Sequence, residues 1–391
     1  MRKRRVVILG ATGSIGNKAM QVARALSDRI DIVGMSTLRN VTKMEKAIRE
    51  FHPKAVCVVD PVSASNLDRS LGKEVKIFCG EEGLVDLIVE LTANIVLIAI
   101  TGTSGLRPAL AAIEMGRDLA LASKEILVTA GSIVTRAVQE KGVQLLPVDS
   151  EHNAIFQCLE GRSMGEVSRL ILTCSGGPFR SLPSEKLAGV TPGKALCHPT
   201  WRMGRKVTVD CATLFNKGLE LIEAHQLFGV PMSRVEVVIH PQSIVHSMVE
   251  FVDGCILAEM GASDMYLPIQ HALMWPERVG PPRKPLNFAV LNRLEFFSPR
   301  WDDFPALRLA QRAGESGGTA PAILNAANEV AVEAFLKKEI PFPRIWGIVE
   351  EVLDRMGDGI SAPDLGQILE TDAEARRLAA FLCEAPLLSS R

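Results

Sequence analysis

Short apolar runs alternate with helix-like stretches over the first 150 residues. Each run is nearly continuous in apolar residues, which is typical of strands covered on both faces of a parallel sheet. Helix-like stretches such as 17–26 and 42–51 lie between them. The alternation predicts an α/β fold whose residues 1–149 form a doubly wound, Rossmann-like domain. The runs expected to form strands are 6–9, 30–33, 55–59, 95–100 and 119–122.

The pattern becomes mixed between residues 150 and 276. Apolar strands such as 169–172 and 235–239 are separated by polar loops that carry glycine, including 175–178 and 197–204. The mixture predicts a central α+β domain over 150–276, which holds most of the polar clusters.

The rest of the chain predicts a linker and a helical bundle. Four prolines between residues 276 and 285 indicate that 277–303 crosses the surface as a linker. Farther on, the spacing of apolar residues is helical, which predicts a C-terminal bundle over 304–391. The expected helices are 320–336, 343–356 and, with a weaker pattern, 369–382.

Composition narrows the class of protein. With 47% hydrophobic and 23% charged residues, the chain has too much apolar surface to remain disordered. A net charge of -1 argues against a nucleic-acid coat or an anionic-membrane binder. Apolar runs fall short of the ~18 residues of a membrane helix, and a strand starting near Arg5 leaves no room for a signal peptide. Eight scattered cysteines without a CxxC pair indicate reduced thiols, so we expect a cytoplasmic protein.

A glycine turn follows the first strand. Gly10, Gly13 and Gly16 stand between strand 6–9 and the first helix. Such a turn lets the backbone approach a pyrophosphate, which the free N–H groups of the helix then bind. The alternative is a tight turn that binds nothing. The second strand ends in Ser36, Thr37 and Arg39 without an acid, so NADPH is favoured over NADH unless Arg39 is merely a solvated loop residue.

Acidic residues form two further clusters. In extended chain, Asp149 and Glu151 project to one side and His152 turns away. This arrangement either starts a hard-cation site or marks a solvated strand end, and the residues alone leave both readings open. Farther on, Asn216 and Glu220 stand one helical turn apart, with Lys217 as either an ordinary partner of Glu220 or part of a phosphate site.

The chain resembles the 1-deoxy-D-xylulose 5-phosphate reductoisomerase family in nine segments that follow one another along nearly its whole length. They are GATGSIG (10–16), ASKE (122–125), PVDSEHNAIFQCL (147–159), TCSGGPFR (173–180), HPTWRMGRK (198–206), DCATLFNKGLE (210–220), HPQSIVHSMVE (240–250), SDMYLPIQHAL (263–273) and ILNAANEVAVEAFL (323–336).

The resemblance implies an activity. Enzymes of this family convert 1-deoxy-D-xylulose 5-phosphate into 2-C-methyl-D-erythritol 4-phosphate in the non-mevalonate isoprenoid pathway. A metal-assisted rearrangement, thought to be a retro-aldol cleavage and re-addition, precedes hydride transfer from NADPH. The expected cofactors are NADPH and Mg²⁺ or Mn²⁺, with Co²⁺ as a further option. The expected partners are a small phosphorylated sugar and a second copy of the chain, with no nucleic acid and no membrane.

The resemblance also assigns roles to matching positions. The expected metal ligands are Asp149, Glu151 and Glu220, which with Lys124 form the catalytic set. The expected substrate-binding residues are Lys124, Ser150, Glu151, Ser175, His198, Cys211, Asn216, Lys217 and Glu220. Trp201 and Met203 match a mobile flap that covers the substrate, and Met265 matches the wall of the site. The expected NADPH-binding residues are Thr12, Gly13, Ser14, Ile15, Arg39, Asn40, Ser123, Glu125 and Gly204.

Three positions depart from the family pattern. Cys211 replaces a usual serine that donates to the phosphate, and a thiol is a weak donor. Leu38 stands where glycine is frequent in the adenosine-binding loop, and Ser123 stands where asparagine is frequent. The metal carboxylates are unaffected.

Two other functions compete with this one. One is a simpler NADP-dependent oxidoreductase that reduces an aldehyde without rearranging carbon. The other is an NADP-sensing protein without enzymatic activity. Neither needs Asp149, Glu151 and Glu220 together, so the acidic triad favours the reductoisomerase.

Overall fold

The computed structural model describes residues 3–72, 74–201, 203–280, 285–357 and 359–384. The chain forms two compact units, and each is built from segments far apart in the sequence. Unit 1 comprises the residues up to Ile126, Val134–Phe156 and Asp264–Pro285. Unit 2 comprises Leu127–Ile133, Gln157–Ser263 and the residues from Leu286 onward.

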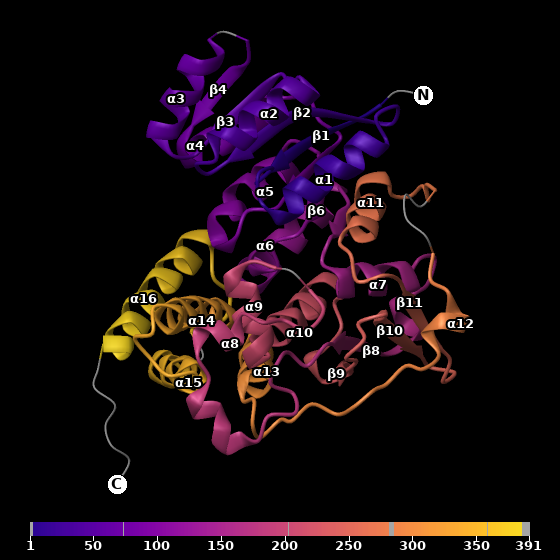
Figure 1. The fold of residues 1–391 in the computed structure, drawn as a ribbon, viewed down its shortest axis with the longest axis vertical. Coiled ribbons are helices and arrows are strands. Elements are labelled where there is room, and N and C mark those ends of the chain that lie inside the picture. The colour runs from indigo at the N-terminus through magenta and orange to yellow at the C-terminus, as the bar shows by residue number, and fades with distance from the viewer. Residues whose placement is uncertain (1–2, 73, 202, 281–284, 358, 385–391) are drawn as a thin grey trace. The chain divides into compact units, whose positions relative to one another are not determined.

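Unit 1 contains a seven-stranded sheet in the order β4-β3-β2-β1-β5-β6-β7, in which every neighbouring pair is parallel (Figure 1). The order reverses beside β1, and ligands of open α/β sheets bind at the carboxyl ends of strands at such a switch point. The strands are β1 Arg4–Leu9, β2 Ile30–Thr37, β3 Ala55–Val58, β4 Lys76–Cys79, β5 Ile95–Ile98, β6 Asp118–Leu121 and β7 Leu145–Pro147.

Helices connect successive strands of this sheet, as parallel pairing requires. They are α1 Ser14–Ala25, α2 Val41–Phe51, α3 Pro61–Leu71, α4 Gly80–Glu90, α5 Leu106–Glu114 and α6 Glu125–Lys141. Two further helices, α7 Ser150–Cys158 and α11 Tyr266–Met274, follow later in the chain. The apolar strand β1 is central to the core, since its Val6, Val7, Ile8 and Leu9 have no exposed surface. The predicted doubly wound α/β domain is confirmed.

Unit 2 contains a four-stranded mixed sheet in the order β11-β10-β8-β9. β10 pairs antiparallel with both β8 and β11, whereas β8 and β9 are parallel. The strands are β8 Val167–Cys174, β9 Val235–Ile239, β10 Val245–Phe251 and β11 Ile256–Met260. Both strands expected here, 169–172 and 235–239, are therefore present.

The C-terminal part of unit 2 is helical. α14 packs against α13, α15 and α16. The observed helix, Ala320–Leu336, has the predicted bounds of 320–336. The helices of this unit are α8 Pro192–Ala195, α9 Arg205–Thr213, α10 Phe215–Phe228, α12 Phe288–Leu291, α13 Ala306–Ser316, α14 Ala320–Leu336, α15 Arg344–Met356 and α16 Leu365–Glu384.

The grouping of α11 differs from the predicted boundary at residue 276. Tyr266, Ile269 and Leu273 on this helix are buried in the core of unit 1, beside residues of β1 and α1. The apolar face of α11 thus finds its partner more than 200 residues earlier in the chain, which local patterning does not reveal. Within the predicted linker, Phe297 bridges to Ile239 of β9, while 281–284 lie outside the described residues.

Two chain-wide expectations concern membranes and thiols. Among the described residues, no helix has the length and apolar character needed to span a membrane. The eight cysteines are all described, and no disulfide joins them.

Phe342 provides a test of the packing in unit 2. This fully buried ring contacts Phe179, Phe335 and Trp346, each with its centroid 5.4 Å away. Phe342→Ala should lower the free energy of unfolding by about 3–5 kcal/mol, because it leaves a large cavity. Urea unfolding followed by tryptophan fluorescence measures the change. Phe381→Ala, which removes a ring that is 62% exposed, should cost less than about 1 kcal/mol; equal losses in both variants would contradict this packing.

Candidate active site

The glycine turn after β1 requires glycine at two positions. Gly10 has a φ of +86°, and a Cβ there would lie 2.3 Å from the carbonyl oxygen of Ala99. A Cβ on Gly16 would lie 2.3 Å from the carbonyl oxygen of Gly10. The start of α1 therefore packs directly on the turn, and only glycine permits this approach.

The end of β2 holds the turn in place. The Ser36 hydroxyl accepts a hydrogen bond from the backbone N–H of Gly10 at 3.0 Å, and the hydroxyls of Thr12 and Thr37 lie 2.6 Å apart. The Ser36 and Thr37 hydroxyls, which the sequence associates with NADPH binding, thus also support the glycine turn.

The turn fits the diphosphate of a dinucleotide. Among the described residues, no side chain caps the N-terminus of α1 at Gly13, so the N–H groups of the first turn remain available to an anion. Four of the predicted NADPH-binding residues lie on this turn: Thr12, Gly13, Ser14 and Ile15.

Arg39 and Asn40 follow β2, as predicted. The Arg39 side chain is 74% exposed, with its Nε 3.3 Å from the carboxylate of Asp60. The Asn40 side chain caps α2 by accepting a hydrogen bond from the N–H of Lys43 at 3.1 Å. An exposed guanidinium suits a 2′-phosphate, whereas Asn40 has a structural duty besides any contact with a nucleotide.

A second cluster of unit 1 lies where β6 and β7 end. Ser123, Lys124 and Glu125 are all buried at the start of α6. The Lys124 ammonium forms an ion pair with Asp149, and the Ser123 hydroxyl donates to the carbonyl of Ile100. Two parallel strands therefore bring together residues that the sequence separates by 25 positions.

The extended conformation expected for residues 149–151 is wrong. Helix α7 begins at Ser150, and the N–H of Asn153 donates to the carbonyl of Asp149 at 2.8 Å, which places Asp149 at the N-cap. Aspartate is a favoured N-cap residue, and a glutamate in the first turn suits the helix dipole. This helix-start signal was present in the sequence, and the Ser150 hydroxyl donates to Glu151 within the first turn.

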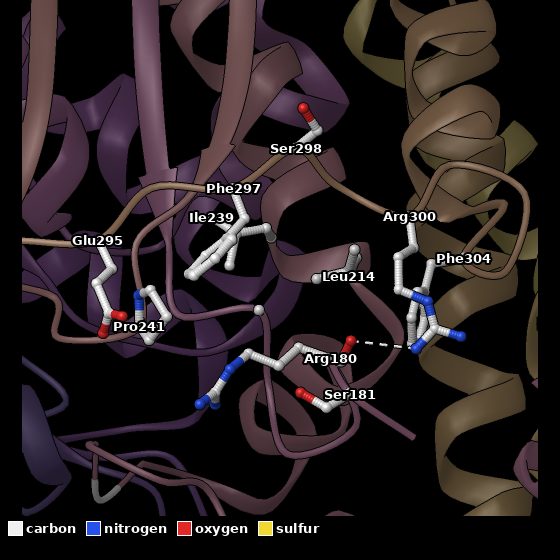
Figure 2. Close-up of a pocket in the computed structure, with 11 residues that line it drawn as sticks. Arg180, Ser181, Leu214, Ile239, Pro241, Glu295, Phe297, Ser298, Arg300 and Phe304 are labelled. Carbon is white, nitrogen blue, oxygen red and sulfur yellow. Dashed lines mark hydrogen bonds between the residues drawn. The ribbon is translucent and has the colours of Figure 1, made fainter. Parts of the chain in front are cut away.

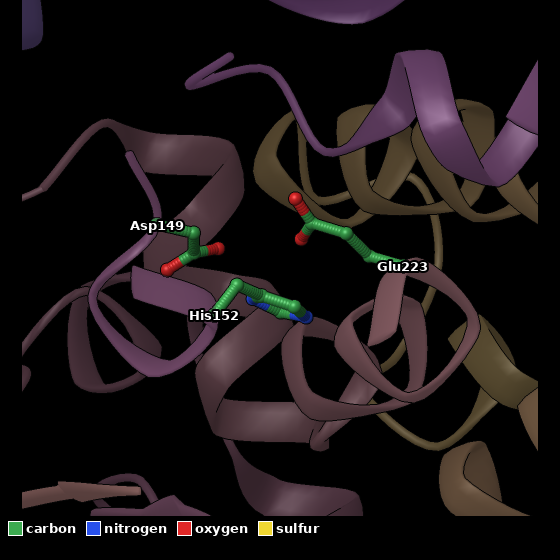
Figure 3. A group of neighbouring side chains, drawn as sticks. All are labelled: Asp149, His152 and Glu223. Atoms are coloured by element: carbon green, nitrogen blue, oxygen red, sulfur yellow. The ribbon is translucent and has the colours of Figure 1, made fainter. Parts of the chain in front are cut away.

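The expectation that His152 turns away from the carboxylates rested on the same extended conformation and is lost with it. His152 is fully buried on α7, and Figure 3 draws it with Asp149, which precedes the helix. The third side chain of Figure 3, Glu223, belongs to α10 of unit 2 and is 1% exposed. Strand alternation therefore says nothing about the direction of the His152 ring.

In unit 2, Ser175 and His198, both expected to bind substrate, lie within hydrogen-bonding distance of each other. The Ser175 Oγ lies 3.0 Å from the His198 Nε2, and it accepts a hydrogen bond from the N–H of Gly177 at 3.2 Å. Burial lowers the pKa of His198 to about 4, so the imidazole is neutral at pH 7. Because Nδ1 of the neutral ring accepts a backbone N–H, the one ring N–H is on Nε2 and donates to the Ser175 Oγ.

The predicted flap continues from His198. Its Nδ1 accepts a hydrogen bond from the N–H of Trp201 at 2.9 Å, and the indole lies 6.3 Å from the ring of His246, centroid to centroid. Met203 is half-buried and Gly204 is exposed at the N-cap of α9, whereas residue 202 is outside the described part of the chain. The Trp201 and His246 rings are therefore neighbours in unit 2.

Residues 210–220 form two helices joined at Leu214, whose φ is +65°. Past this turn, the Asn216 amide donates to Glu220 at 2.6 Å, and the Lys217 ammonium forms an ion pair with Glu220. Side-chain exposures of 2% for Lys217 and 1% for Glu220 show that the pair is buried. The backbone of Cys211, on α9, packs against the loop that follows Ser175. A Cβ on Gly177 of this loop would lie 2.4 Å from the Cys211 carbonyl oxygen.

Asp210 makes two contacts that the sequence did not predict. The buried Asp210 carboxylate accepts a hydrogen bond from Asn328 of α14 at 2.9 Å and pairs with Lys206 at 2.8 Å. The pair fixes α9, which follows the flap, to the C-terminal bundle. Only the i,i+4 spacing of Lys206 and Asp210 was visible beforehand, and such pairs are common on exposed helices.

The predicted metal ligands have the donor chemistry of a hard-cation site. Asp149, Glu151 and Glu220 all present carboxylate oxygens, which Mg²⁺ and Mn²⁺ prefer. Within each unit, their charges are balanced by a buried ammonium, Lys124 for Asp149 and Lys217 for Glu220.

Sequence profiles of one family match nearly the whole chain. The profile of 1-deoxy-D-xylulose 5-phosphate reductoisomerase matches residues 6–131, and the two profiles of its C-terminal domain match residues 145–228 and 260–378.

Curated relatives match over similar lengths. The 1-deoxy-D-xylulose 5-phosphate reductoisomerase of Symbiobacterium thermophilum is 49% identical over 379 residues, which cover 96% of this chain and 97% of that protein. The enzyme of Caldanaerobacter subterraneus subsp. tengcongensis is 47% identical over 374 residues, covering 95% and 97%.

Solved structures agree with the fold. The Zymomonas mobilis enzyme in complex with NADPH superposes with a TM-score of 0.92 at 43% identity, covering 98% of this chain and all of that one. A DOX-P reductoisomerase in complex with NADPH, fosmidomycin and magnesium gives a TM-score of 0.93 at 38% identity, covering 97% and 98%.

Acid should destabilise the protein through His246. Burial lowers the pKa of this imidazole from 6.5 to about 4. Between these values the unfolded chain binds a proton that the folded chain does not, so the free energy of unfolding falls as the pH drops from about 6.5 toward 4. Urea unfolding at several pH values should show a shallower fall for His246→Phe than for the natural chain.

The matched control is His52→Asn, which changes an exposed histidine of unit 1 with a φ of 49°. Its fall in stability should equal that of the natural chain. A His246→Phe variant with an unaltered pH dependence would show that His246 is not held neutral by burial.

Proposed function

The chain belongs to the 1-deoxy-D-xylulose 5-phosphate reductoisomerase family, and we propose how its residues divide the work of this reaction. The reaction converts 1-deoxy-D-xylulose 5-phosphate into 2-C-methyl-D-erythritol 4-phosphate, for isoprenoid synthesis, with NADPH and a divalent cation such as magnesium. The observation that carries the conclusion is the near-complete coverage of relatives with this activity, at up to 49% identity among those described above.

The metal ligands in this proposal are Asp149, Glu151 and Glu220. Support comes from the resemblance at these three positions and from an all-oxygen donor set. Lys124 and Lys217 then hold the carboxylates in place before a cation arrives, since each forms an ion pair with one of them. Such support from neighbouring groups limits the reorganisation that binding requires.

The phosphate of the substrate is proposed to bind in unit 2. The Ser175 hydroxyl, the Asn216 amide and the Lys217 ammonium supply donors, and the neutral His198 ring orients Ser175. Cys211 completes this set with a weaker thiol donor. Lysine binds phosphate as a point charge, so Lys217 carries most of the attraction.

NADPH is proposed to bind along the carboxyl ends of β1 and β2. The first turn of α1 binds the diphosphate and Arg39 binds the 2′-phosphate. Glu125 and Ser123, at the start of α6, stand on the nicotinamide side. Gly204 contributes from the flap of unit 2.

The protein residues act on charge, orientation and water. When bound, the divalent cation supplies Lewis-acid stabilisation of developing oxyanions, and NADPH supplies the hydride. Lys124 neutralises charge that develops on the substrate oxygens, and Ser150 orients a substrate hydroxyl. The flap with Trp201 and Met203 closes over the substrate and excludes water, which protects the aldehyde until it is reduced.

The setting of the enzyme completes the proposal. The domain roles are NADPH binding for 1–149, metal and substrate binding for 150–276, connection for 277–303 and support for 304–391. A homodimer in the cytoplasm is what the family resemblance supports. Analytical ultracentrifugation of the purified chain tests the dimer directly.

Metal dependence is the decisive test of the proposed ligands. NADPH oxidation at 340 nm with 1-deoxy-D-xylulose 5-phosphate should stop in excess EDTA and return with Mg²⁺, because the rearrangement needs the cation. Glu220→Gln should lower kcat/KM by about 100-fold or more while NADPH still binds. Glu333→Gln, at a 68% exposed side chain of α14, should leave the rate unchanged.

Two outcomes would contradict the proposal. Full activity without metal would favour a simpler reductase, since the acidic triad would then be dispensable. Metal-loaded, folded protein that binds NADPH without turnover would favour an NADP sensor.

Replacing Cys211 should strengthen substrate binding, whereas Glu220→Gln should impair the enzyme. Cys211→Ser should lower the KM for the sugar phosphate about fivefold, because a hydroxyl donates a stronger hydrogen bond worth roughly 1 kcal/mol. The KM for NADPH should not change. Steady-state kinetics measures both constants, with Cys158→Ser on α7 as the control thiol. A KM equal to that of the natural chain would mean that residue 211 does not contact the phosphate.

A further inference from the structure

Unit 2 contains a cavity of about 390 Å³ that none of the proposed substrate residues lines (Figure 2). Its size falls in the range of small-molecule sites in proteins. The walls come from the loop after β8, the junction of α9 and α10, the end of β9 and the segment that follows α12. The lining residues are Gly176, Arg180, Ser181, Leu214, Ile239, Pro241, Glu295, Phe297, Ser298, Arg300 and Phe304.

One side of the cavity is apolar. Leu214, Ile239 and Phe304 line the cavity and are nearly fully buried. The ring of Phe297 stands beside Ile239. The Phe297 side chain is 52% exposed, which is unusual for an aromatic residue held by a backbone bridge to β9. A flat apolar group in the cavity would cover it.

The other side is cationic, and its two arginines differ. Arg300 is fully engaged, since it pairs with Asp303 at 2.7 Å and donates to the carbonyls of Arg180 and Leu182 at 3.1 and 2.6 Å. It therefore fixes the wall. Among the described residues, the guanidinium of Arg180 has no carboxylate within ion-pair distance, and Figure 2 shows it extended along the cavity. Its donors remain available to an anion.

The only carboxylate of the lining does not neutralise Arg180. Glu295 accepts a hydrogen bond from Gln242 at 3.1 Å and lies 3.5 Å from Arg293. With Glu295 engaged there, the cavity combines an apolar wall with an unpaired guanidinium.

The cavity is separate from the proposed phosphate site but shares a wall with it. A Cβ on Gly176 would lie 3.0 Å from side-chain atoms of both Arg180 and Ile239, so this glycine packs closely against the cavity lining. Ser175, the preceding residue, faces His198 instead. Leu214 likewise precedes the helix that carries Asn216 and Lys217.

We propose that this cavity is a second binding site, which takes a small anion with a flat apolar body, such as an aromatic carboxylate or sulfonate. Arg180 pairs with the acidic group, and Ile239, Phe297 and Phe304 cover the ring. An occupant contacts Gly176 and Leu214, the neighbours of the phosphate-binding residues, so the site is placed to influence how tightly substrate binds.

The test uses the full-length protein with Mg²⁺, NADPH and inorganic phosphate at saturating concentrations, so that the proposed active site is occupied. The probe is 6-(trifluoromethyl)-2-naphthoate, observed by ¹⁹F NMR line broadening. We expect saturable binding at one site. Arg180→Gln should weaken it about tenfold through loss of the ion pair, and Ser181→Trp should abolish it by filling the cavity.

The matched control is Arg308→Gln, which removes one positive charge from an exposed arginine of unit 2 that does not line the cavity. It should bind the probe as the natural chain does. Absence of saturable binding in the presence of saturating phosphate, unchanged affinity in both Arg180→Gln and Ser181→Trp, or equal weakening in Arg308→Gln would each overturn the proposal. These outcomes concern binding alone, so they are independent of whether the enzyme turns over.

Discussion

The Glu220 carboxylate is almost fully buried, and the residues around it in unit 2 must compensate its charge. Burying a charge is unfavourable by several kcal/mol unless it is paired and hydrogen-bonded. Here the Lys217 ammonium and the Asn216 amide supply the partners, and all three side chains project from the first two turns of α10. Their geometry depends on the left-handed turn at Leu214, which starts the helix abruptly after α9. Replacing a buried ion pair by apolar residues is often neutral or stabilising, so we read the buried charges as retained for chemistry.

Unit 1 also pairs a lysine with a proposed metal-binding carboxylate. Lys124 and Asp149 follow two strands of one parallel sheet and form an ion pair at their carboxyl ends. In both units an ammonium holds a carboxylate that belongs to the proposed cation site. The pairs hold the acids in position while no cation is present. The Asp210–Asn328 pair extends this support to the bundle.

How far the sequence predicted the structure depended on whether the deciding contacts were local. The helix over Ala320–Leu336 and strand Val235–Ile239 matched their predicted spans, because apolar spacing alone determines them. The extended reading of 149–151 failed because the N-cap preference of Asp149 outweighed the strand that precedes it. Placement of α11 in the core of unit 1 depends on packing with residues far away in the chain, which no local pattern encodes.

The candidate residues came from motif resemblance, and the structure adds partners that spacing cannot give. The Lys217–Glu220 pair was visible as i,i+3 spacing, whereas the Lys124–Asp149 pair and the contact of Trp201 with His246 were not. The most direct test of the account follows both the carbon skeleton and the hydride. ¹³C-labelled 1-deoxy-D-xylulose 5-phosphate and NADPH deuterated at the transferring position should give a branched methyl-tetritol phosphate with deuterium on its new CH₂OH carbon, seen by NMR. A deuterated product with an unbranched five-carbon skeleton would contradict the account.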